Sequence, residues 1–199
     1  MKKIPLFPLS TVLYPKTYLP LIVFEERYKI MLDHCLSKDW PMGVVLIKNG
    51  REVGGSAEPC DVGTEAKIVA SEKLGNGKYT VVVRGERRFR ITWIDYSKPY
   101  LQAHVEYIDR NSDEVTEPEL KSKIEGFFRK YLEVLEGLGI SACKEEIHSL
   151  PPEHYSYVVA DMLQLGADEK QQLLEASTTT ERFRMELEYL VTILRGQKL

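Results

Sequence analysis

The stretch IPLFPLSTVLYPKTYLPLIVFEERY, residues 4–28, decides the fold of this 199-residue chain. Its four prolines, Pro5, Pro8, Pro15 and Pro20, lie among apolar residues. Each proline fixes the backbone φ angle and removes a hydrogen-bond donor, so the stretch forms neither a continuous helix nor a central strand. We therefore expect short extended segments at the edge of a sheet.

From Glu25 the spacing of the apolar residues changes to that of a helix. They recur at positions i, i+3, i+4, i+7 and i+8, which places them on one helix face: Tyr28, Met31, Leu32, Cys35 and Leu36. The first 37 residues therefore predict a strand, a turn, a second strand and an amphipathic helix.

Further β-prone runs follow as far as residue 108. Asn49-Gly50 predicts a turn, Gly75-Asn76-Gly77 a hairpin connection, and Gly85 a bulge inside the longest run. Roughly seven extended segments in about 108 residues are typical of a small closed or nearly closed barrel. The clearest runs after the first helix are residues 42–48, 62–72, 78–96 and 100–108.

The C-terminal part of the chain differs in composition and periodicity. Residues 109–118 are almost without apolar side chains and predict a linker, and the pattern beyond them is helical. Residues 1–110 carry a net charge of +4, whereas residues 111–199 carry −7. We expect two domains, a β-barrel domain at 1–110 and an α-helical domain at 111–199.

Several motifs in the first domain resemble one known family. They are PLFPLSTVLYP, LPLIVFEERY, VGTEAKI, VRGERRFRI and PYLQAHVE, in this order along the chain. Together they are similar to the N-terminal, substrate-binding domain of the Lon protease family. The resemblance implies an α+β fold, in which a PUA-like β pseudo-barrel with an inserted helix is followed by a C-terminal helical domain.

The motifs of catalysis are missing from the sequence. It holds no GxxxxGK[ST] loop for ATP phosphates, no GxSxG elbow and no Lon-type peptidase domain with its Ser–Lys pair. The four histidines have no HExxH spacing, and the group around Glu145, Glu146, His148 and His154 is more typical of a solvated turn than of a metal site. We expect no enzyme activity, no cofactor and no metal, in a free-standing version of the Lon domain.

The three cysteines and the apolar start of the chain bear on its compartment. The cysteines form no CxxC pair, which favours a reducing environment. The prolines near the N-terminus interrupt a signal peptide, and no apolar run reaches the length of a membrane span. The sequence predicts a soluble, cytoplasmic protein.

A basic run lies in the longest β-prone segment. Its residues Arg84, Arg88 and Arg90 offer an RNA-binding alternative, because some PUA-like barrels bind RNA. We favour a solvated face in which they pair with Glu86 and other neighbours, with Arg87 turned inward against a carboxylate, because the net charge of the barrel domain is modest for nucleic-acid binding.

The remaining candidate is an apolar surface for protein binding. The resemblance implies recognition of unfolded or damaged protein segments, and an unpaired strand edge beside an apolar groove suits an extended peptide. Three alternatives stay open: a partner protease or chaperone that receives the segments, a homo-oligomer formed through the N-terminal edge, and a small enzyme with a dispersed site. The candidate binding residues are Phe7, Tyr14, Tyr18, Phe24, Tyr96 and Tyr100.

Overall fold

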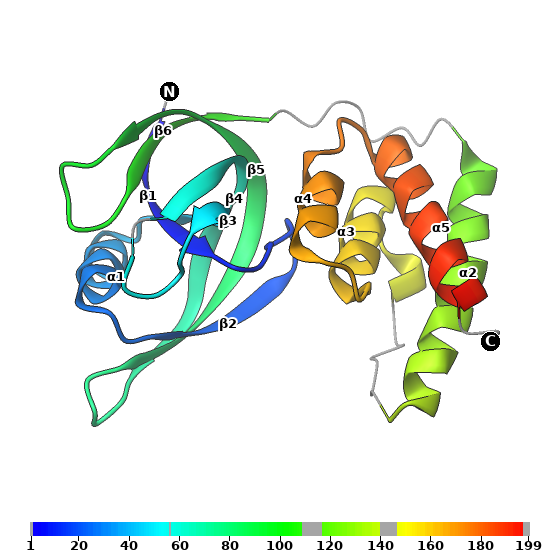
Figure 1. The fold of residues 1–199 in the computed structure, drawn as a ribbon, viewed down its shortest axis with the longest axis horizontal. Helices are drawn as coiled ribbons and strands as arrows, with labels where there is room; N and C mark the ends of the chain where they lie inside the picture. The colour runs from blue at the N-terminus through cyan, green and yellow to red at the C-terminus, as the bar shows by residue number, and fades with distance from the viewer. Residues whose placement is uncertain (1, 56, 109–116, 140–146, 197–199) are drawn as a thin grey trace. The chain divides into compact units, whose positions relative to one another are not determined.

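The chain forms two compact units, Met1–Asp109 and Arg110–Leu199, in a computed structural model that describes residues 2–55, 57–108, 117–139 and 147–196 (Figure 1). The first unit is a β-barrel with one helix, and the second is helical. The α+β fold predicted from the sequence is confirmed.

The barrel unit is built on a six-stranded mixed sheet. The strand order is β2-β5-β4-β3-β1-β6, and an additional pairing of β5 with β6 closes the barrel. Strand β2 pairs only with the first half of β5, so it stands outside the closed ring. The elements are β1 (Lys2–Leu9), β2 (Tyr18–Val23), α1 (Glu26–Lys38), β3 (Met42–Gly50), β4 (Ala57–Lys73), β5 (Tyr79–Asp95) and β6 (Gln102–Tyr107).

The proline-rich stretch lies at an edge only in part. As expected, β2 is an edge strand. The expectation is wrong for β1, which pairs antiparallel with β6 over Lys2–Pro5 and parallel with β3 over Leu6–Leu9. Each half of β1 pairs with one strand only. Its prolines therefore do not interrupt a strand that is hydrogen-bonded on both sides along its whole length.

Gly85 marks the predicted bulge in β5. The register of β5 with β4 shifts beside it, between Glu65 and Ala66. Gly85 N donates a hydrogen bond to Thr17 O at 3.0 Å, and Gly85 O accepts one from Lys16 N at 2.8 Å. The segment before β2 is thereby held directly against the β5 backbone.

The predicted turns have mixed outcomes. Leu74 N donates to Lys78 O at 2.8 Å, and Gly77 has a positive φ of 76°, which confirms the hairpin at 75–77. The turn expected at Asn49-Gly50 is wrong, since β3 continues through Gly50, which pairs with Ala57. Six strands are present among the described residues, where roughly seven extended segments were expected.

Helix α1 closes one end of the barrel core with its apolar face (Figure 1). Four of its five predicted face residues are buried, whereas Leu36 is exposed. The buried part of the face packs with residues of β1, β3, β4 and β5 in one cluster. This packing fixes α1 and the end of β2 that leads into it. The buried residues of the face are Tyr28, Met31, Leu32 and Cys35.

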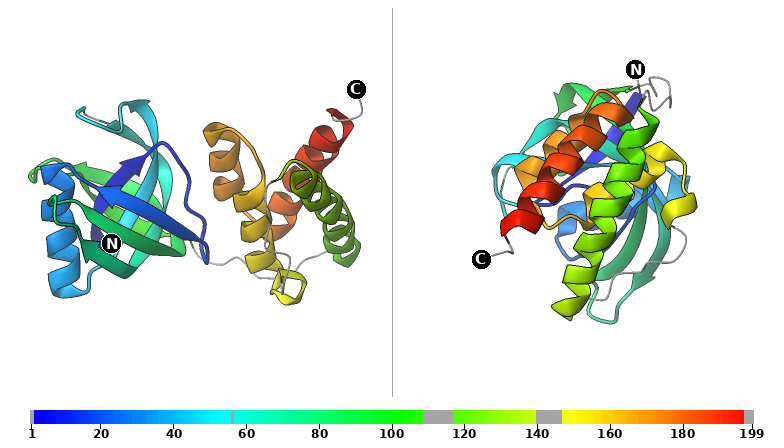
Figure 2. Two further views of the ribbon diagram at one scale, coloured as in Figure 1. Left: turned by 90° about the horizontal axis from the view of Figure 1, so that it is seen from below. Right: turned by 90° about the vertical axis from the view of Figure 1, so that its right-hand side faces the viewer.

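The helical unit has five helical segments and a core cluster of its own (Figure 2). Pro152 stands in the first turn of its helix, and Thr178 Oγ1 accepts a hydrogen bond from Glu181 N at 3.0 Å. Leu138 is exposed. The segments are α2 (Pro118–Gly137), η1 (Ile147–Ser149), α3 (Pro152–Met162), α4 (Ala167–Glu175) and α5 (Thr179–Gly196).

Candidate functional site

The edge strand β2 exposes apolar side chains in the described part of the barrel unit. Tyr18 and Ile22 are 58% and 64% exposed, and Phe24, just beyond the strand, is 44% exposed. The other side chains of the strand, Leu19, Leu21 and Val23, point toward the barrel core. The strand therefore has one face in the core and one apolar face outside it.

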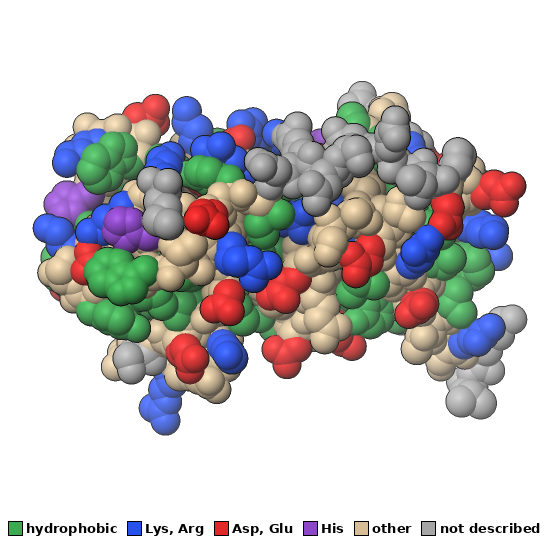
Figure 3. Space-filling view, turned by 90° about the horizontal axis from the view of Figure 1, so that it is seen from above, with side chains coloured by type: hydrophobic (Ala, Val, Ile, Leu, Met, Phe, Trp, Pro, Cys, Tyr) green, Lys and Arg blue, Asp and Glu red, His purple; other side chains and the backbone are tan. Residues whose placement is uncertain are grey.

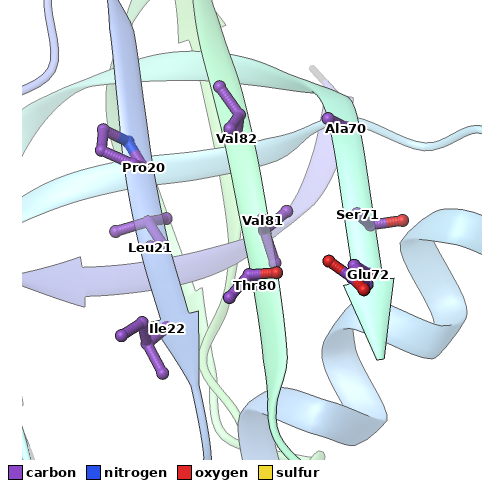
Figure 4. A pocket seen from close by; sticks show the side chains of 9 residues that line it. All are labelled: Pro20, Leu21, Ile22, Ala70, Ser71, Glu72, Thr80, Val81 and Val82. Atoms are coloured by element: carbon purple, nitrogen blue, oxygen red, sulfur yellow. The ribbon is translucent and has the colours of Figure 1, made fainter. Parts of the chain in front are cut away.

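The outer face of β2 continues across β5 to β4 as a shallow depression of 470 Å³ (Figure 4). Strand register places two rows of side chains across it. We call this surface the β2 face. The first row is Pro20, Val82 and Ala70, and the second is Ile22, Thr80 and Glu72.

A second depression, of 290 Å³, lies beside β2 toward α1 and the segment at residues 52–53. It is lined by Phe7, Phe24, Tyr28 and Val53, among others, and shares the middle of β2 with the β2 face. Strand β2 therefore lies between two apolar hollows. Extended chains expose their side chains alternately to opposite sides, and hollows of this kind accept such side chains.

Charged groups lie at the margins of this region. Arg84 donates two hydrogen bonds to Glu86 Oε1, from Nε at 2.9 Å and from Nη2 at 2.6 Å. Lys78 Nζ stands 5.9 Å from the centre of the Phe24 ring. Charged groups thus flank a surface whose lining is mostly apolar, which is the usual anatomy of a protein-binding surface.

Pro20 limits how this edge can bind a peptide. A peptide that adds a strand to a sheet needs a regular row of donors and acceptors along the edge. Pro20 has no N–H, and prolines of this kind protect edges against pairing with other chains. This edge is therefore less suited to main-chain pairing than to contacts through its side chains.

The structure separates the candidate residues named from the sequence. Phe7, Tyr14 and Tyr100 are buried in the barrel unit, because they fill its core. Tyr18 and Phe24 are exposed beside β2, and Tyr96 is exposed on the segment that follows β5. Other residues beside β2 were not predicted, although the alternation of YLPLIV already places Tyr18, Pro20 and Ile22 on one face. The missed residues are Ile22, Val53 and Val82.

The basic residues of β5 do not form one exposed face. Arg84 bonds to Glu86 as expected, and Arg90 is exposed. Arg88, expected in solvent, is buried, because the register shift beside Gly85 breaks the alternation of the strand. Arg87 pairs with the Glu65 carboxylate at 3.1 Å, as predicted, but its side chain is half exposed and not turned inward.

Reactive groups do not gather in the described part of the chain. No cluster of three or more His, Cys, Asp or Glu side chains there could hold a metal ion, and Glu145 and Glu146 lie outside the described residues. Burial raises the pKa of the Cys35 thiol to about 11, which keeps it protonated and unreactive. None of the described helices has the length and hydropathy of a membrane span.

Comparison with known proteins agrees with this architecture. The model of the family described as ATP-dependent protease La (LON) substrate-binding domain matches residues 3–192. The chain belongs to this family. The resemblance predicted from the sequence motifs is thereby confirmed for both units of the Lon-type chain.

Curated relatives and solved structures show the extent of the likeness. The Lon-type chain is 29% identical to a Lon protease of Anaeromyxobacter dehalogenans and 31% identical to Lon protease 2 of Myxococcus xanthus, in each case over 94% of this chain and 23% of the relative. It thus spans about a quarter of the length of these relatives. A Lon N-terminal domain protein from Xanthomonas campestris has the same fold, with a TM-score of 0.73 and 24% identity over 94% of this chain and 98% of that one.

Proposed function

We propose that this chain binds exposed apolar segments of unfolded or damaged proteins at the β2 face, without catalysis of its own. The exposure of Tyr18, Ile22 and Phe24 between two apolar hollows carries the proposal. Family membership supports it, since the matched domain is described as substrate-binding. The matched domain makes up 23% of the curated Lon relatives, so their proteolytic activity is not transferred to this chain.

The shape of the β2 face favours weak and broad recognition. Its hollows are shallow and apolar, and they offer few hydrogen-bonding groups to select one sequence. Binding through a small area is typically transient. Such binding suits a module that samples many segments and passes them, in the cytoplasm, to a partner protease or chaperone.

A charge placed on the β2 face should weaken this binding. Ile22→Glu puts a carboxylate where an apolar side chain would be buried, and an unpaired charge is costly to desolvate. We expect affinity for a fluorescent peptide rich in Leu and Phe to fall by at least about tenfold, which corresponds to about 1.4 kcal/mol. Fluorescence anisotropy measures the change.

Leu138→Glu is the matched control. Leu138 is 68% exposed, close to the 64% of Ile22, but it belongs to the helical unit. The control variant should bind the peptide like the unmodified chain. Equal binding by all three proteins would place the peptide elsewhere and refute the proposed site.

A further inference from the structure

A second surface of the barrel unit differs in chemistry from the β2 face. It is a depression of 380 Å³ between α1, the start of β1 and the segment that joins β5 to β6. We call it the lysine pocket. The lining residues that matter here are Lys3, His34, Lys38, Trp40, Lys98 and Tyr100.

The lysine pocket carries excess positive charge. No Asp or Glu is among the residues that line it. Lys3 is partly neutralised by Asp95, to which its ammonium group donates. Lys38 and Lys98 are exposed, and neither makes an ion pair with an acidic side chain in the described part of the chain. Two ammonium groups are therefore available to an anion.

Aromatic side chains form the walls of the same pocket. Trp40 is 51% exposed, and Lys38 Nζ stands 4.3 Å from the centre of its ring. The Tyr100 hydroxyl lies 2.9 Å from His34 Nδ1, so this hydrogen bond orients the imidazole. The pocket thus combines charge with a partly open aromatic surface, which suits a ligand that is both anionic and apolar.

A neighbouring depression of 260 Å³ extends this surface. It shares Lys98 and Tyr100 with the lysine pocket and adds Arg27 and the exposed ring of Tyr96. Arg27 is engaged by Glu25 and by the carbonyl of Gly55, so it contributes less free charge. On the face of the barrel unit seen in Figure 3, Lys, Arg and His side chains lie among hydrophobic and acidic ones.

We propose that the lysine pocket binds acidic polypeptide segments, with carboxylates held by Lys38 and Lys98 and an aromatic side chain of the ligand against Trp40. Lysine ammonium groups are mobile point charges that accept a carboxylate in many orientations. Charge complementarity selects an acidic peptide, and the apolar wall selects one that contains aromatic residues. None of these six pocket residues lines the β2 face. A test that refutes one of the two proposed sites therefore leaves the other proposal standing.

Tryptophan fluorescence offers a local test. Trp40 is one of two tryptophans, so a Trp93→Phe background leaves it as the sole reporter. The probe is a short peptide of alternating Glu and Phe, compared with the same peptide carrying Gln in place of Glu. At low salt we expect the Glu peptide to change Trp40 emission and to bind at least about tenfold more tightly than the Gln peptide. Added salt should weaken it, because exposed charges are screened.

Paired variants identify the ammonium groups. Lys38→Gln with Lys98→Gln should reduce Glu-peptide affinity by at least about tenfold. The control, Lys48→Gln with Lys123→Gln, removes two exposed lysines outside the pocket and should leave the affinity unchanged. All four positions are exposed, so folding is preserved. Equal binding of both peptides, or no loss in the Lys38/Lys98 variant, would overturn the proposal. So would an RNA oligonucleotide that displaces the peptide and binds more tightly.

Discussion

The Gly85→Ala substitution should destabilise the barrel unit more than the addition of a methyl group at any other position of β5. A Cβ atom at this position would lie 2.1 Å from Tyr14 O and 2.9 Å from Tyr14 C, and both are backbone atoms. Relief requires the segment before β2 to move away, which would break the hydrogen bonds of Gly85 with Lys16 and Thr17. The cost should reach at least about 3 kcal/mol, the upper end of the range for overpacking.

Thermal unfolding followed by circular dichroism measures this effect. A loss of this size corresponds to a fall in the melting temperature of about 10–20 °C for a unit of this length. Gly75→Ala is the control, because a Cβ there meets nothing within 4 Å and the backbone needs no positive φ. A melting temperature for Gly85→Ala equal to that of the control would show that the contact of residues 14–17 with β5 is not as described.

The stability of the helical unit should decrease as the pH rises from 5 to 9. Burial raises the pKa of Glu186 from its ordinary value of 4.5 to about 8, although Arg182 and a hydrogen bond from Ser156 act in the opposite direction. The neutral acid is therefore preferred in the folded state. The stabilisation is present in full below the unfolded pKa and is lost as the pH passes the folded pKa, with a total on the order of a few kcal/mol.

The surroundings of Glu186 explain this direction. Its side chain is buried between α3 and α5, and Ser156 Oγ donates to its Oε1 at 2.6 Å. Arg182 Nε is bonded to Ser156 at 2.7 Å and lies 4.0 Å from the carboxylate, while its guanidinium stacks on Tyr157. The arginine is thus shared among several groups, Thr179 included, and compensates the carboxylate only in part.

Urea unfolding of the chain at pH 5, 7 and 9 tests this prediction. Glu186→Gln removes the titrating group and should flatten the dependence on pH, because the amide stays neutral throughout. The control is Glu188→Gln, because Glu188 is an exposed residue on the same helix. This variant should keep the dependence of stability on pH. If the Glu186→Gln chain retains the full decrease, another group causes it.

The sequence predicted much of the barrel because its signals are local. The prolines, the 3.6-residue spacing of α1 and the Gly75–Gly77 hairpin each act over a few residues. The path of β1 was not predictable in this way, since its two partners are set by distant strands. Arg88 shows the same limit: one extra residue in β5 moves it into a buried position, and no local pattern reports that shift.

The sequence predicted the type of the candidate site, an apolar surface, but only some of its residues. An apolar edge beside β2 follows from the prolines, but burial depends on which side chains the barrel encloses. Tyr14 and Tyr18 look alike in sequence, yet Tyr14 is fully buried and Tyr18 is exposed. The lysine pocket has no sequence signature, because α1, β1 and the segment before β6 supply its residues separately.

Backbone NMR of the isotope-labelled chain tests the central claim most directly. Titration with the unlabelled Leu- and Phe-rich peptide should shift the amide signals of Tyr18–Val23 outside Pro20, together with those of residues 70–72 and 80–82, which line the β2 face. Signals of α2, α3 and α5 should stay in place. Binding that shifts the helical signals and leaves those of β2 unchanged would contradict the account.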